Sequence, residues 1–343
     1  MKKIMMFEEY KAYKRKQNIK RTIYFILAIF FVWLIFIFKT PYTIVTMGGT
    51  DDVRQRIVVE GGFRSRGSFN IVYVNVQDGT VYNLVKTMFQ RRELINTSNG
   101  TVDDRVEYIY TDSSYQNAIV NLLVLLEEEG MEIDYDEFVT YLFDDVSCDL
   151  RIGDEILKYD GNRLNEPQPF IDYIQSFELP AKVTLELRGT DRETRTVTCD
   201  LQKLGSRNVI GYGYIGVNRL MSEHAVVERI GTYLNMYSGP SSGFVITLEL
   251  YNQLTMKDLT KGYDVVATGT IEYDGSIGQI GFVEMKLLAA EESGADYLFV
   301  ADNDNEGSNY KIALQMKEEM DLDIEVVKIN HINEAISFLK GLE

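Results

Sequence analysis

Histidine, cysteine and proline are scarce in this chain of 343 residues, which contains two, two and five of them respectively. So few histidines and cysteines argue against a metal site, and no metal or cofactor is expected. Cys148 and Cys199 can pair if the fold brings them together, but two separate buried thiols are the favoured interpretation. Few prolines and no internal repeat also argue against extended disorder.

Positive charge is scarce beyond the first 39 residues. The chain has 35 basic and 52 acidic side chains, and residues 1–39 hold nine of the basic and two of the acidic ones. The remainder therefore carries 26 basic against 50 acidic residues. A body this acidic repels nucleic acid and anionic headgroups, so no nucleic-acid partner is expected.

One long apolar run stands out near the amino terminus. Residues 23–38 read IYFILAIFFVWLIFIF without a charge, and with their neighbours they predict a transmembrane signal anchor at 22–40. The basic cluster in residues 1–21 predicts a cytoplasmic amino terminus and an extracellular remainder. The segment after the run lacks the small residues of a signal-peptide cleavage site, so an uncleaved anchor in the cell membrane is favoured over a secreted protein.

Residues 41–130 predict mixed β and α structure. Strands are expected within 54–78 and helices at about 80–92 and 112–129. We expect this segment to pack with the C-terminal domain, so that the unit at 131–205 is an insertion into one fold.

The unit at 131–205 predicts the order strand, strand, helix, strand, strand. The sequences GDEIL (153–157) and DGNRL (160–164), then a helix and two closing strands, resemble the later half of a PDZ domain. PDZ domains bind peptide carboxyl termini by strand addition beside a carboxylate-binding loop. The sequence DEFVTYLF (136–143) stands where that loop is expected and lacks its usual glycine. The resemblance therefore implies the fold more strongly than peptide binding.

A serine-rich turn occurs at 238–243, where SGPSSG leads into a predicted helix. One interpretation is helix N-capping, in which a serine hydroxyl accepts a bond from a free backbone N–H. The other is a nucleophile lying beside backbone N–H groups that can stabilise an oxyanion. Taken alone, the turn favours capping, because most helices have a cap.

A second predicted helix, from Val283 to Gly294, has a lysine among small residues. Lys286 shares one helix face with Ala289, Ala290 and Ser293. The structural interpretation is a lysine whose stem lies along apolar surface. The functional one is a general base, which requires burial to lower the lysine pKa from about 10.4 toward about 7–8.

Together these two motifs resemble the Lon-type serine–lysine proteases. The segment DLTKGYDVVATGTIEYDGSIGQIGFVEMKLLAA (258–290) follows SGPSSG in the family's order and at similar spacing. The resemblance implies an α/β (α+β) proteolytic domain at 206–343. It implies Ser241 as the nucleophile, Lys286 as the general base and Thr268 as a supporting hydroxyl, with an acyl-enzyme intermediate.

The order of anchor, PDZ-like unit and Lon-type domain is similar to that of membrane-anchored, PDZ-containing Lon-like proteases of Gram-positive bacteria. Two positions depart from the family pattern. Ser242 replaces a usual alanine and adds a second candidate hydroxyl, and Gly281–Phe282 replaces a Gly-Gly pair. A phenylalanine there can narrow the substrate cleft or shift the start of the lysine helix.

No G-x-x-x-x-G-K-[ST] sequence occurs, so no ATP is expected to be used. The sequence thus predicts an ATP-independent serine endopeptidase that cleaves exported peptides or unfolded proteins at the outer face of the membrane. The alternative is an inactive membrane-tethered PDZ/Lon-like scaffold or sensor that binds exported proteins. A Ser-His-Asp triad would require His224 or His331, which lie in no recognisable motif. The oligomeric state stays open.

Overall fold

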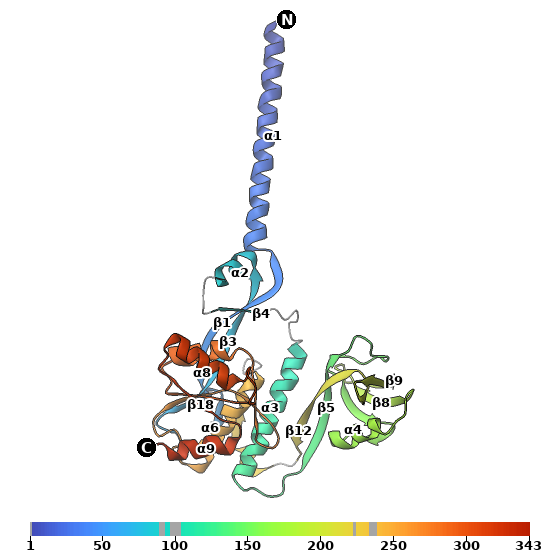
Figure 1. Ribbon diagram of the computed structural model, residues 1–343, viewed down its shortest axis with the longest axis vertical. Coiled ribbons are helices and arrows are strands. Elements are labelled where there is room, and N and C mark those ends of the chain that lie inside the picture. The colour runs from blue at the N-terminus through green and yellow to red at the C-terminus, as the bar shows by residue number, and fades with distance from the viewer. Residues whose placement is uncertain (1, 89–92, 97–103, 222–223, 233–238) are drawn as a thin grey trace. The chain divides into compact units, whose positions relative to one another are not determined.

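The computed structural model divides the chain into two compact units (Figure 1). It describes residues 2–88, 93–96, 104–221, 224–232 and 239–343. The smaller unit comprises Met1–Met47 and Val74–Asn99, and the larger comprises Gly48–Tyr73 and Gly100–Glu343. The segment predicted at 41–130 is thus shared between the two units.

The smaller unit contains the long helix α1 (Lys2–Phe36). Its part from Glu9 to Phe36 is long and apolar enough to cross a membrane, a property that a signal sequence shares. Beyond it, the start of β1 (Lys39–Asp52) pairs with β4 (Glu93–Asn96), and α2 (Val81–Thr87) follows β3. The helix predicted at 80–92 therefore ends earlier, and residues 89–92 lie outside the described part of the chain.

The larger unit is built around parallel strands, of which β14 and β17 are buried except at their first residues. In the order β18-β17-β14-β3 they pair in parallel, and β1 and β4 complete the sheet. Their apolar runs, such as YLFV in β17, are typical of strands covered on both faces. The bounds of the parallel strands are β3 Ser68–Thr80, β14 Asp264–Ala267, β17 Tyr297–Val300 and β18 Glu325–Lys328.

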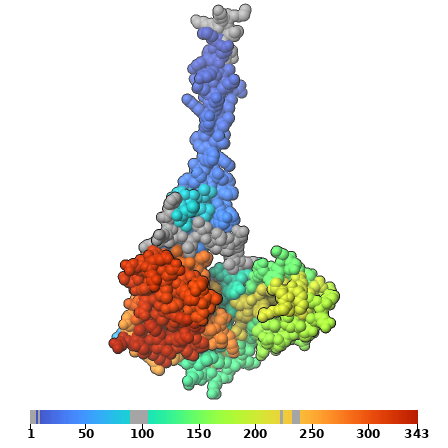
Figure 2. Space-filling view, viewed as in Figure 1, coloured from blue at the N-terminus to red at the C-terminus, as the bar shows by residue number. Residues whose placement is uncertain are grey.

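Helices α3 (Asp104–Leu125), α6 (Gly243–Thr255) and α9 (Ile332–Gly341) contribute to one hydrophobic core with β3, β14 and β17. Figure 2 shows the residues from 243 onward, in orange to red, as one continuous mass. Although β3 and α3 precede the PDZ-like unit in sequence, they share this core with α6 and β14, which follow it.

A separate sheet forms the PDZ-like part, in the order β12-β5-β6-β8-β9 around its own core. Its last strand, β12, lies beyond the boundary predicted at residue 205. The sequence 136–143, expected at the carboxylate-binding loop, instead lies almost entirely within β5. The elements are β5 Ile133–Leu142, β6 Glu155–Tyr159, β7 Asn162–Arg163, α4 Pro167–Gln175, β8 Lys182–Arg188, β9 Thr194–Asp200 and β12 Tyr212–Leu220.

Short elements connect these parts. The turn η3, which carries the two adjacent serines, leads into α6, and the lysine-bearing helix α7 packs against α8. The remaining elements are η1 Val53–Gln55, β2 Ile57–Val59, β10 Gln202–Leu204, β11 Arg207–Val209, α5 Ala225–Glu228, β13 Ile230–Thr232, η3 Pro240–Ser242, β15 Thr270–Ile271, β16 Ile277–Gly278, α7 Val283–Glu292 and α8 Asn309–Met320.

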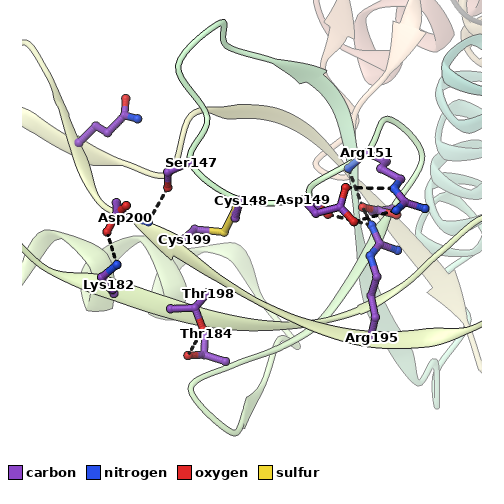
Figure 3. Close-up of a disulfide and its surroundings, with 12 residues drawn as sticks. Ser147, Cys148, Asp149, Arg151, Lys182, Thr184, Arg195, Thr198, Cys199 and Asp200 are labelled. Carbon is purple, nitrogen blue, oxygen red and sulfur yellow. Dashed lines mark hydrogen bonds and ion pairs between the residues drawn. A yellow bond between two sulfur atoms is a disulfide. The ribbon is translucent and has the colours of Figure 1, made fainter.

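The two cysteines form a disulfide, so the preference for separate thiols was wrong. Cys148, in the loop between β5 and β6, is bonded to Cys199 on β9, 51 residues along the chain (Figure 3). The same loop and strand are also joined by polar contacts, because Ser147 Oγ accepts from Asp200 N at 2.7 Å. The pairing depends on a loop being folded back onto the sheet edge, which no local pattern encodes.

Candidate active site

The serine-rich turn has a backbone shape that explains most of its sequence. Gly239 has a φ of +63°, in the region that favours glycine. Pro240 begins the 3-10 turn η3, where its fixed φ suits a helix start. Gly243, the first residue of α6, lies so close to α3 that a Cβ there would overlap the side chain of Ser114. Three of the motif's residues are therefore set by the shape of the turn.

The two adjacent serines point to different partners. Lys286 Nζ donates to Ser241 Oγ at 2.8 Å, whereas the buried Ser242 donates its hydroxyl to the Gly239 carbonyl at 2.8 Å. Ser242, at the N-cap of α6, makes no side-chain capping bond. Capping therefore does not explain the motif, and of the two hydroxyls the one on Ser241 faces the lysine.

Lys286 is buried on α7 and touches two hydroxyls. Its side chain is 6% exposed, and Nζ also donates to Thr268 Oγ1 at 3.1 Å. Within the described ranges of the chain, no carboxylate forms an ion pair with this lysine. Burial lowers the pKa of Lys286 to about 8, because the charged form loses its hydration.

Thr268 is held at the carboxyl end of β14, the usual location of sites in parallel sheets. Its amide donates to the Phe299 carbonyl at 3.1 Å, which extends the pairing of β14 with β17. The next amide, of Gly269, donates to the Ser241 carbonyl at 2.9 Å. The structure thus brings Ser241, Thr268 and Lys286 together from a turn, a strand end and a helix.

Phe282, which stands where a Gly-Gly pair was expected, takes a backbone conformation that favours glycine. Its φ is +60°, in the left-handed region, which costs an L residue on the order of 1 kcal/mol. Helix α7 nevertheless begins at Val283, as predicted, and the Lys286 amide donates to the Phe282 carbonyl at 3.1 Å. The expected shift of the helix start does not occur.

Both histidines act as helix caps. His331 Nδ1 accepts from the Asn333 amide at 3.1 Å at the start of α9, and its Nε2 bonds the Asp274 carbonyl at 2.9 Å. His224 accepts from the Val226 amide at the start of α5. These contacts give a triad no support. Nor do the described residues contain a group of three His, Cys, Asp or Glu side chains suited to a metal ion.

Sequence reasoning missed the polar residues of α3 that surround the serine turn. Ser114 Oγ donates to the Pro240 carbonyl at 2.7 Å, and Asn117 Nδ2 donates to the Ile271 carbonyl at 3.1 Å. Asn121 Nδ2 donates to the Glu272 carbonyl at 2.8 Å. A usable signal was present, because these three polar residues recur at helical spacing in an otherwise apolar stretch.

Comparison with known proteins places this site in a recognised domain type. Residues 236–339 match the family model of the Lon protease (S16) C-terminal proteolytic domain. Over 99 residues the chain is 30% identical to the Lon protease of Aster yellows witches'-broom phytoplasma, strain AYWB. That alignment covers 29% of this chain and 12% of the relative. The chain thus contains a Lon-type proteolytic domain, of the serine peptidase class.

Solved PDZ domains are similar to part of the chain. The PDZ domain of the SdrC-like protein Lmo2051 from Listeria monocytogenes is 26% identical, with a TM-score of 0.22, and the match covers 23% of this chain and 86% of that one. The PDZ domain of the SdrC-like protein Lin2157 from Listeria innocua is 23% identical, with a TM-score of 0.21 and coverage of 25% and 94%.

Proposed function

We propose that the chain is a serine endopeptidase in which Ser241 is the nucleophile and Lys286 the general base. One observation carries the proposal: a lysine 6% exposed lies 2.8 Å from a serine hydroxyl. A buried lysine without a carboxylate partner costs stability, so this arrangement is expected where a neutral amine is used.

The proposed reaction begins with Lys286 in its neutral form. Its amine takes the proton from Ser241 Oγ as that oxygen attacks the peptide carbonyl, and the resulting ammonium gives the proton to the leaving amine. A water molecule, deprotonated by the same amine, then hydrolyses the acyl-enzyme. Thr268 accepts a bond from the lysine and so orients Nζ toward Ser241.

The helix start beside Ser241 supports the same chemistry. The turn η3 and helix α6 direct their positive dipole end to the nucleophile. Negative charge that develops on the serine oxygen or on the substrate carbonyl is stabilised there, whereas a lysine ammonium is not. The helix start therefore disfavours the ammonium in the resting enzyme and stabilises the oxyanion that forms during the reaction.

The proposal also states where in the cell the protein acts. Helix α1 serves as a single-pass anchor in the cell membrane, with the basic residues 2–21 in the cytoplasm and the proteolytic domain outside. The substrates are then exported peptides or unfolded proteins, cleaved without ATP. The PDZ-like sheet is proposed to bind segments of such substrates by strand addition.

The test is cleavage by the full chain in nanodiscs, assayed with an unfolded protein and with an acylating serine-reactive probe in the absence of ATP. Wild type and Ser242→Ala are expected to cleave and to be acylated, whereas Ser241→Ala and Lys286→Ala are not. The rate is expected to rise with pH through about 8, as Lys286 loses its proton.

Retained cleavage in Ser241→Ala would move the nucleophile elsewhere. A folded wild type that neither cleaves nor reacts would favour the inactive scaffold instead. No contact in the described part of the site favours that scaffold, since Phe282 leaves the start of α7 in place.

A further inference from the structure

We propose that Ser114 on α3 is a positioning residue that fixes the peptide plane in front of the nucleophile. This inference rests on the proposed function of Ser241. It assigns a role in the reaction to a helix that lies outside the matched segment 236–339 and more than a hundred residues before it in the chain.

The contact itself is short and shielded from water. Ser114 is 4% exposed, and its Oγ donates to the Pro240 carbonyl oxygen at 2.7 Å. The first residue of α6, Gly243, leaves room for this hydroxyl, because a Cβ at that position would overlap Ser114 Oγ. One side chain of α3 thus touches both ends of the serine turn.

Because of peptide geometry, this contact also orients the backbone of the nucleophile. The Pro240 carbonyl and the Ser241 N–H belong to one planar trans peptide and point in opposite directions. A bond that holds the carbonyl toward α3 therefore holds the Ser241 N–H away from α3. On the other side of the same residue, the Ser241 carbonyl accepts from the Gly269 amide at 2.9 Å. The peptide groups on both sides of Ser241 are thereby fixed.

The same helix also binds the segment that follows Thr268. Asn117, one turn after Ser114, donates to the Ile271 carbonyl, and Asn121 donates to the Glu272 carbonyl. Helix α3 is therefore a common support for the serine turn and for the segment that follows Thr268. Loss of the Ser114 hydroxyl removes the bond to the serine turn and leaves the two asparagine bonds in place.

The test compares Ser114→Ala with Ser113→Ala in the full chain, in nanodiscs. Ser113 is a matched control, because its buried hydroxyl also donates to a backbone carbonyl, that of Gly216 on β12 at 2.8 Å. Cleavage rates are measured as a function of pH and divided by the number of sites that the acylating probe labels. For Ser114→Ala we expect kcat to fall about tenfold with KM nearly unchanged, and the midpoint of the pH profile to rise as water reaches Lys286.

Ser113→Ala is expected to keep the wild-type kcat and midpoint, and Ser114→Thr, which keeps the hydroxyl, to recover most of the rate. If Ser114→Ala does not fold, Ser114→Cys replaces it, since a thiol is a weak donor of similar size. The inference is overturned if the Ser114 variant loses stability but keeps the kcat and midpoint of the Ser113 variant. If the Ser241→Ala variant cleaves as fast as the wild type, the proposed function is refuted, and this inference with it.

Discussion

The proteolytic and PDZ-like parts of the larger unit both bury ionisable side chains, but they surround them differently. In the PDZ-like part, Asp154 is 1% exposed and forms an ion pair with Arg195. Glu137, equally buried, accepts bonds from the hydroxyls of Tyr135 and Tyr212 at 3.2 and 2.8 Å. Each of these two carboxylates therefore accepts from two donors, since Asp154 also accepts from the Arg151 amide at 2.7 Å.

Two buried ionisable groups of the proteolytic part, Lys286 and Glu249, have weaker partners than these. Lys286 touches only the hydroxyls of Ser241 and Thr268 among the described residues. Glu249 on α6 is 0% exposed; its Oε1 accepts from Gln253 at 2.7 Å, and its Oε2 has no partner in the part of the chain that the structure describes. Burial raises the pKa of Glu249 to about 7.

The contrast is clearest between the ion-paired Asp154 and the lysine beside neutral hydroxyls, because burial raises the pKa of Glu137 to about 7, as it does that of Glu249. An ion pair or a hydroxyl pair offsets part of the desolvation cost of a buried carboxylate. A buried lysine beside neutral hydroxyls offsets little of it, so its retention is best explained by the reaction proposed above. Substitutions in the two parts should therefore change stability in opposite directions.

Lys286→Met should have the largest effect, because it removes the proposed base and a desolvated charge together. Cleavage is expected to fall about 1000-fold. The free energy of unfolding at pH 7 is expected to rise by roughly 3 kcal/mol, since the folded pKa of about 8 lies below the unfolded value of 10.5.

This gain in the free energy of unfolding should depend on pH. The penalty of the wild-type lysine is fully present below about pH 8 and disappears as the pH rises to 10.5, so the gain should shrink over that window. Urea unfolding at pH 7 and pH 10.5 measures it, with the exposed Lys340→Met as control. A Lys286→Met variant no more stable than wild type at pH 7 would contradict the comparison.

Arg195→Ala should have the opposite effect in the PDZ-like part. It leaves Asp154 buried without its cation and is expected to lower the free energy of unfolding by about 3–5 kcal/mol. Arg163→Ala, which breaks a pair whose arginine is 64% exposed, should cost less than about 1 kcal/mol. Denaturant unfolding measures both, and equal losses would refute the distinction between the buried and the exposed pair.

Glu249→Gln should stabilise the protein at high pH by about 3 kcal/mol. The pKa of this group is raised from 4.5 to about 7, so its contribution to stability is present below pH 4.5 and lost as the pH rises through 7. The Glu249 variant should lose this pH dependence of stability, whereas Glu306→Gln, at a fully exposed position, should keep it. Thermal unfolding between pH 4.5 and pH 8 provides the measurement, and an unchanged slope in the Glu249 variant would count against it.

Phe282→Gly should have the smallest effect. Glycine adopts the left-handed conformation without the Cβ penalty, so a gain of about 1 kcal/mol is expected, with cleavage retained. Gly281→Ala is a suitable control, because a Cβ there meets no atom within 4 Å. Lost cleavage in Phe282→Gly, detected with the same unfolded substrate, would mean that the aromatic ring has a role in the cleft.

Much of the proteolytic part was predictable, because its signals are local. The lysine helix predicted from Val283 to Gly294 is α7, Val283–Glu292, and the helix predicted after the serine turn is α6. The sequence also pointed to three side chains, and the structure places the hydroxyls of Ser241 and Thr268 2.8 and 3.1 Å from Lys286 Nζ. Each of these predictions followed from a turn, a periodicity or a short motif.

The errors concern contacts between distant segments. Helix α3 begins at Asp104, earlier than the predicted residue 112, and its polar face became meaningful only once the serine turn lay against it. The Cys148–Cys199 pairing and the strand β5 in place of a loop have the same origin. In each case the partner lies dozens of residues away, so local propensity carries no information about it.

The sequence by itself thus indicated an apolar helix, an α/β (α+β) domain with several of its turns and helices, and the residue types available for a serine–lysine reaction. Tertiary structure alone decided which serine faces the lysine, how far the lysine is desolvated, and which helix supports the turn. The physical reason is that burial and hydrogen-bond partners are properties of packed surfaces. A pKa near 8 for Lys286 exists only after those surfaces have excluded water.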